Sequence, residues 1–90
     1  MAPDDVMELE KHSCPELFLC LGGRAGLVIY DGETEKTVEF EPGEELLVSD
    51  YHNGFLIEQD AFFLVVERTA FTTDYIDRKT RGPLRSVTVE

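Results

Sequence analysis

Hydrophobic residues occur in short runs separated by turn residues along most of the chain. Short runs bounded by Gly, Pro, Asn and Asp are typical of β-strands, whereas an amphipathic helix would repeat about every 3.6 residues. The pattern therefore predicts an all-β, antiparallel sandwich or small barrel. The expected strands cover residues 17–21, 25–30, 37–41, 45–48, 55–57 and 61–66.

Turn signals support this assignment. Asp31-Gly32 favours a tight hairpin after residues 25–30, because both residues tolerate a positive φ. Residues 37–41 then alternate between apolar and polar side chains, as a half-buried strand does. Pro42-Gly43 supplies the next turn. The polar stretch 49–54 is expected to be a loop.

The pattern changes in the last quarter of the chain. Thr72 or Thr73 could cap a helix, and Arg78 and Lys79 follow late, where cations favour a helix end. This predicts a short helical turn over residues 74–79. Residues 86–89 alternate like a final strand, which could pair with its own sheet or with the sheet edge of a partner.

Length and charge limit the classes of function. Ninety residues suffice for one domain, residues 1–90, with a core at about 10–68 and a C-terminal extension at 69–90. The formal net charge of -11 disfavours binding to nucleic acids and anionic membranes, and fits a solvated acidic surface. No stretch resembles a signal peptide or a membrane span, so we expect a cytoplasmic protein. Cys14 and Cys20 lack metal-site spacing and are expected to be free thiols.

One stretch and one turn carry a resemblance to a known family. The spacing His12-x3-Glu16-x6-Gly23 matches the second half of the first cupin motif, G-x5-H-x-H-x3,4-E-x6-G. Pro42-Gly43 lies near the start of the second motif. Together with the order of strands and turns, the chain resembles the cupin superfamily from about residue 10 to residue 68. The resemblance implies a small cupin-like antiparallel barrel or sandwich of the jelly-roll type.

The resemblance also implies a metal centre, with departures from the family pattern. Glu10 stands where the family has its first histidine, and Gly54 stands at the histidine position of the second motif, two residues after His52. Imidazoles and carboxylates on alternate strand positions suit Fe, Mn, Ni or Zn. The candidate metal ligands are Glu10, His12, Glu16 and His52.

The loop predicted at residues 49–54 offers candidate ligand-binding side chains, Tyr51 and His52, since loops at barrel mouths commonly bind small molecules. The alternative interpretation is an ordinary turn around Asn53-Gly54. Reactive cysteine chemistry is disfavoured, because an acidic chain with two histidines offers little to activate a thiol.

Three functions remain open from the sequence. The first is a cupin-like small-molecule binding protein, with a sugar or carboxylate ligand in the barrel and a degenerate or absent metal centre. The second is a metal-dependent enzyme of the isomerase or dioxygenase type, as the resemblance implies. The third is a structural or interaction module whose barrel is filled by side chains. Exposed sheet edges further predict a homodimer that adds or exchanges strands.

Overall fold

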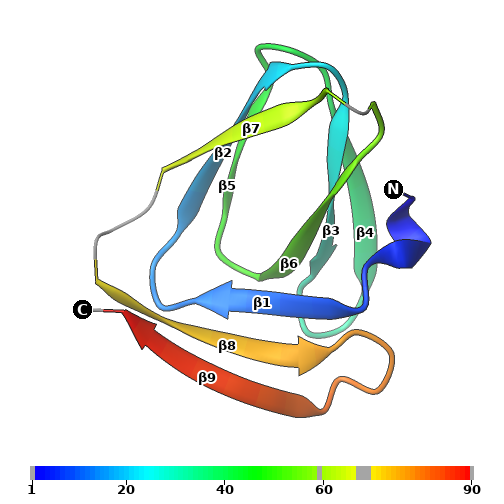
Figure 1. The fold of residues 1–90 in the computed structure, drawn as a ribbon. Coiled ribbons are helices and arrows are strands. Elements are labelled where there is room, and N and C mark those ends of the chain that lie inside the picture. Colours follow the sequence, from blue (N-terminus) through cyan, green and yellow to red (C-terminus); the bar gives the residue numbers. More distant parts are fainter. Residues whose placement is uncertain (1, 59, 67–69, 90) are drawn as a thin grey trace.

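Figure 1 shows a computed structural model of the chain, which describes residues 2–58, 60–66 and 70–89, with only the backbone of residues 62–64. Nearly all of the regular secondary structure in this part is β-strand, and every strand pair is antiparallel. The prediction of an all-β, antiparallel fold is therefore confirmed. A short 3-10 helix, η1 (Pro3–Asp5), precedes the first strand.

The strands form two sheets. The larger has the order β4-β3-β6-β1-β8-β9 and the smaller the order β5-β2-β7. The larger sheet contains β1 (Glu8–His12), β3 (Ala25–Tyr30), β4 (Glu35–Phe40), β6 (Tyr51–Leu56), β8 (Phe71–Asp77) and β9 (Pro83–Val89). The smaller sheet contains β2 (Glu16–Gly22), β5 (Glu45–Val48) and β7 (Phe62–Val66).

Two apolar clusters cover the two faces of the larger sheet. One lies between the sheets and consists of Phe18, Cys20, Leu27, Ile29, Phe40 and Val48. The other lies on the outer face of the larger sheet and consists of Val6, Leu9, Val28, Phe55 and Ile76. Because successive strand residues point to opposite faces, β1 contributes Leu9 to the outer cluster and turns its even-numbered residues towards the interior.

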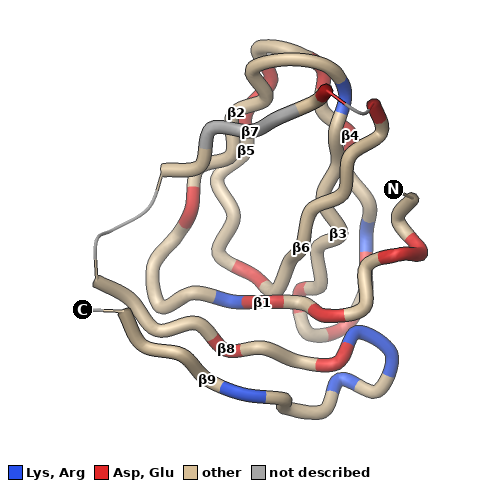
Figure 2. Tube along the Cα trace, in the orientation of Figure 1, with Lys and Arg blue, Asp and Glu red and all other residues tan. Residues whose placement is uncertain are grey.

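Arg78 and Arg81 connect the turn after β8 to β4 through ion pairs, and Arg78 connects it to the N-terminal segment through hydrogen bonds. Arg78 pairs with Glu35 at 2.8 Å and donates to the carbonyl oxygens of Pro3 and Val6. Arg81 pairs with the same carboxylate at 3.1 Å. Figure 2 shows basic residues at this turn, with further basic residues on β1, β4 and β9 and acidic residues along the whole chain. The hydrogen bond from Arg78 holds the backbone at Val6, whose side chain belongs to the outer cluster.

The helical turn predicted at residues 74–79 is wrong. Residues 71–77 form strand β8, and the turn that follows is closed by Asp77, whose carboxylate accepts from the backbone N–H groups of Lys79 and Thr80. Threonine, tyrosine and isoleucine favour extended backbone, and β8 gains a full ladder along β1. The expected loop at 49–54 is also wrong from Tyr51 onwards, where β6 begins.

Other predictions have mixed outcomes. Cys14 and Cys20 are free and buried, as expected. No helix in the described part of the chain is both long and apolar enough to cross a membrane. The homodimer, the single-domain organisation and the cytoplasmic location stay predictions.

Candidate metal centre

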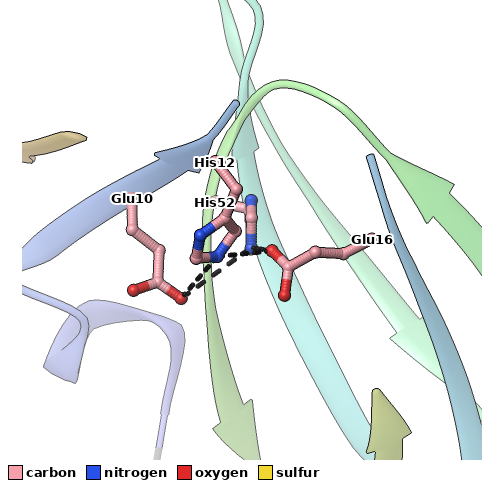
Figure 3. A group of neighbouring side chains, drawn as sticks. All are labelled: Glu10, His12, Glu16 and His52. Atoms are coloured by element: carbon pink, nitrogen blue, oxygen red, sulfur yellow. Dashed lines mark ion pairs between the residues drawn. The ribbon is translucent and has the colours of Figure 1, made fainter. Parts of the chain in front are cut away.

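Three strands bring four titratable side chains to one point between the sheets. Glu10 and His12 lie two positions apart on β1 and therefore share a face. His52 lies on β6, directly opposite Glu10 in the strand register. Glu16 begins β2 and reaches the same point from the smaller sheet. Figure 3 shows the four side chains converging.

The closest contacts centre on one carboxylate oxygen. Oε1 of Glu16 lies 2.6 Å from Nε2 of His12 and 2.8 Å from Nε2 of His52. Oε1 of Glu10 lies further out, at 3.6 Å from Nε2 of His12 and 3.9 Å from Nε2 of His52. One ligand atom from each residue falls within 4.8 Å of all the others.

These separations fit a single transition-metal ion. Metal–nitrogen and metal–oxygen distances of about 2.1 Å place neighbouring ligand atoms about 3.0–3.4 Å apart, for angles between about 90° and 109°. The observed distances lie on both sides of that range, so small side-chain movements would accommodate an ion. Two imidazoles and two carboxylates also form a donor set that Fe, Mn, Ni and Zn accept.

Burial is uneven around the cluster. The side chains of His52, Glu16 and His12 are 2%, 5% and 8% exposed, whereas that of Glu10 is 28% exposed. Three candidate ligands are therefore enclosed by protein, and solvent reaches the cluster on the side of Glu10. Glu10 is also the residue held least closely to the others.

The second ring nitrogen of each histidine has its own partner. Nδ1 of His52 lies 2.8 Å from the carbonyl oxygen of Asp50, and Nδ1 of His12 lies 2.6 Å from Oγ1 of Thr73. A carbonyl oxygen can only accept, so Nδ1 of His52 carries a hydrogen and the neutral ring presents a lone pair at Nε2. Partners of this kind orient metal-binding histidines.

The proton affinity of His52 reflects its neighbours. Burial alone would lower the pKa of His52, but the hydrogen bond to Glu16, the bond to the Asp50 carbonyl and the charges of Glu16 and Glu10 raise it above the ordinary value. The cluster thus attracts positive charge to the position between His52 and Glu16.

Two aromatic rings flank the histidines. Phe18 meets His52 edge-on with ring centroids 5.3 Å apart, and Phe71 meets His12 in the same way at 5.1 Å. Phe18 belongs to the buried cluster between the sheets, whereas Phe71 starts β8 and is half-buried. The rings restrict rotation of both imidazoles and keep the centre dry on two sides.

The structure brings together all four candidate metal ligands from the sequence. Tyr51 lies beside His52 on β6 but points to the opposite face, where it packs on the outer cluster, so it does not join the group. Its ligand-binding role stays a prediction. Sequence reasoning missed Thr73 and Phe71, because a helical turn was expected at residues 74–79 with Thr72 or Thr73 as its cap. The run of β-branched and aromatic residues at 71–76 was the available signal for a strand.

Thr73→Val is expected to weaken metal binding by about 10–100-fold, because valine keeps the shape and removes the hydroxyl partner of His12. Isothermal titration with Zn²⁺ would measure the change. Thr72→Val is the matched control, since Thr72 bonds to Thr88 instead of to the cluster. Equal affinities for the two variants would contradict a positioning role for Thr73.

Comparison with known proteins finds neither a family model nor a curated protein that matches this chain.

Proposed function

We propose that this protein is a cupin-like small-molecule binding protein that holds a divalent transition metal at Glu10, His12, Glu16 and His52. The observation that carries the proposal is the convergence of both Nε2 atoms on one oxygen of Glu16, at 2.6 and 2.8 Å. The metal would be Fe, Mn, Ni or Zn.

Charge balance supports the proposal. Nε2 of neutral His52 and the ionised Glu16 carboxylate are both acceptors, and two acceptors at 2.8 Å need a positive charge between them. A proton on Nε2 of His52 would supply that charge in the metal-free cluster. A divalent cation would take its place and neutralise the carboxylate of Glu16, which is otherwise costly to bury.

The four residues would have different roles in such a site. His12, His52 and Glu16 form the enclosed set that would hold the ion. Glu10 is more distant and more exposed, so it stands where a bound small molecule would enter. A bound metal would supply Lewis-acid chemistry, polarising an oxygen of that molecule.

The nesting of strands supports the jelly-roll interpretation. β3 pairs with β4, β2 with β5, and β1 with β6, as in a long hairpin that has been folded over. The two sheets then pack with a shared interior, which is the arrangement of double-sheet jelly rolls. With the spacing of His12, Glu16 and Gly23, this nesting is the basis for proposing membership of the cupin superfamily.

Among the alternatives, a metal-dependent enzyme of the isomerase or dioxygenase type uses the same residues and differs only in turning over its ligand. A purely structural interior is less favoured, because apolar side chains would fill it without burying the carboxylate of Glu16. The open side at Glu10 favours a site that receives a small molecule.

Metal content tests the proposal directly. Protein purified without a metal-affinity tag is expected to carry close to one equivalent of Fe, Mn, Ni or Zn, measured by elemental analysis. Removing the ion with a chelator should lower the melting temperature, and adding it back at 100 times its Kd should restore about 2.7 kcal/mol of stability. Substoichiometric metal without a thermal shift would overturn the proposal.

The pH dependence of stability is expected to reverse when metal is bound. In the metal-free protein the raised pKa of His52 stabilises the fold below the ordinary value of 6.5, and this contribution is lost as the pH rises through the raised pKa. Metal binding instead displaces the proton, so its stabilisation grows over the same pH range.

Melting curves between about pH 5.5 and 8, with and without Zn²⁺, would measure both slopes. Glu35 and Asp77 do not interfere, because their neighbours hold the pKa of each carboxyl below its usual range. A Zn²⁺-induced shift in melting temperature that stays constant with pH would exclude the histidine from the metal site.

A further inference from the structure

The last part of β9, residues 86–89, has two chemically different faces. On one face, Ser86 bonds to Asp74 and Thr88 bonds to Thr72, so polar side chains pair across β8 and β9. On the other face lie Val87 and Val89, next to Arg85, which pairs with Glu8 at 2.9 Å and lies over the ring of Tyr75. All residues of β9 are exposed, and the two valines remain 45% and 44% exposed. An alternating edge strand normally turns its apolar face to a core, and here that face is left uncovered.

The register places the two valines on the side of the metal centre. Val87 lies opposite Thr73 and Val89 lies opposite Phe71. Thr73 contacts His12 through its hydroxyl, and the ring of Phe71 meets the same imidazole. Residues directly opposite each other in an antiparallel pair point to the same face. Phe71, Val87 and Val89 therefore form an apolar shelf, continuous with the wall of the centre beside His12.

The shelf begins at a candidate metal ligand and runs outward along the larger sheet. Figure 1 shows β8 and β9 extending the sheet past β1, on the side away from β3 and β4. Two inter-strand spacings of about 4.8 Å separate β9 from β1, so the shelf extends roughly 10 Å from the strand that carries Glu10 and His12.

We infer that the ligand of the metal centre is an amphipathic small molecule, with an oxygen-bearing head that contacts the metal and an apolar body that lies on this shelf. The inference rests on the proposed function and specifies its ligand class. The head would enter beside Glu10, the exposed member of the cluster. The apolar body would cover Phe71, Val87 and Val89, which nothing in the described part of the chain covers fully.

Two hydroxamates of different length test the inference. Both carry the same metal-chelating oxygens, but acetohydroxamate has only a methyl group, whereas octanohydroxamate has a chain long enough to reach β9. Titration calorimetry on the Zn²⁺-loaded protein should show octanohydroxamate binding at least 10-fold more tightly. In Val87→Ser/Val89→Ser the ratio should fall below about 2-fold, with the affinities for acetohydroxamate and Zn²⁺ unchanged.

Leu47→Ser is the matched control for non-specific adsorption. Leu47 is 63% exposed on β5, pairs with Leu17 in the smaller sheet and points away from the interior. This variant should keep the full preference for the longer chain. The proposed role of the shelf is contradicted if Leu47→Ser loses the preference for octanohydroxamate, or if Val87→Ser/Val89→Ser keeps it.

The remaining outcomes separate the shelf from the metal centre. If the wild-type protein binds the two hydroxamates equally well, the shelf does not bind the alkyl chain, whereas the proposal of a metal centre is unaffected. Absence of both Zn²⁺ and acetohydroxamate binding would overturn the proposed function, and the shelf with it. If the wild-type protein is a dimer and Val87→Ser/Val89→Ser is a monomer, a second copy of the chain covers the shelf. That outcome also contradicts the inference.

Discussion

Glu16→Gln is expected to reduce the affinity for Zn²⁺ or Mn²⁺ by at least about 100-fold, a larger loss than the removal of an orienting partner causes. Both imidazoles converge on Oε1 of Glu16, and the Glu16 side chain is 5% exposed. Glutamine keeps the shape but replaces an anionic oxygen with a neutral amide, which is a weaker ligand for a divalent cation. Titration calorimetry would measure the affinity.

The metal-free variant should behave differently. Without an ion, the wild-type cluster buries the carboxylate of Glu16 with only the histidine rings beside it, and glutamine removes that buried charge. We therefore expect metal-free Glu16→Gln to be about as stable as metal-free wild type at pH 8, while losing the stabilisation that metal provides. Denaturant unfolding with and without Zn²⁺ would separate the two effects.

Glu45→Gln provides the matched control. This substitution removes the same charge from β5, the neighbour of β2 in the smaller sheet. Glu45 is exposed and lies opposite Leu19 on the outer face of that sheet. Metal affinity should remain within about 2-fold of wild type, as expected for an exposed charge outside the site. A Glu16→Gln variant that binds metal as tightly as Glu45→Gln would remove Glu16 from the site.

The fold class was predictable from the sequence because short apolar runs and turn residues are local signals of strands. Short apolar runs and the turns at Gly32 and Gly43 mark β2 to β5 and β7 with small errors at their ends. β1 and β8 were missed, and β6 was expected only from residue 55 onwards; these segments carry many polar residues. They are held as strands by their neighbours in the sheet, which single-sequence patterns do not contain.

The candidate ligands were predictable for a different reason. Glu10 and His12 share a face in any extended segment, and the spacing to Glu16 and Gly23 resembles a known motif. The partner of His12 was not predictable, because Thr73 is 61 residues away and reaches it only through the pairing of β1 with β8. The opposite orientation of Tyr51 follows from β6 being a strand, where neighbouring residues face opposite sides.

Gly26→Ala is expected to destabilise the fold by about 2–3 kcal/mol, an unusually large effect for adding one methyl group. A Cβ at Gly26 would lie 2.3 Å from Cζ of Phe55 and 2.8 Å from Cε1. Phe55 sits opposite Gly26 in the register and covers the glycine with its ring, as part of the outer cluster. The ring would have to leave its packed position, and denaturant unfolding would measure the loss.

Gly54→Ala is the internal comparison, because Gly54 lies on β6 beside Phe55 and a Cβ there would meet Cδ2 of Leu27 at an ordinary 3.6 Å. The stability of Gly54→Ala should differ from that of wild type by less than about 1 kcal/mol.

If the clash with the ring is the cause, Gly26→Ala combined with Phe55→Leu should be at least about 1 kcal/mol more stable than the sum of the single changes predicts. Additive effects would instead show that Gly26 is required for its backbone and not for the space above it. Since β6 also carries His52, a displaced Phe55 should weaken metal binding as well, whereas Gly54→Ala should leave it intact.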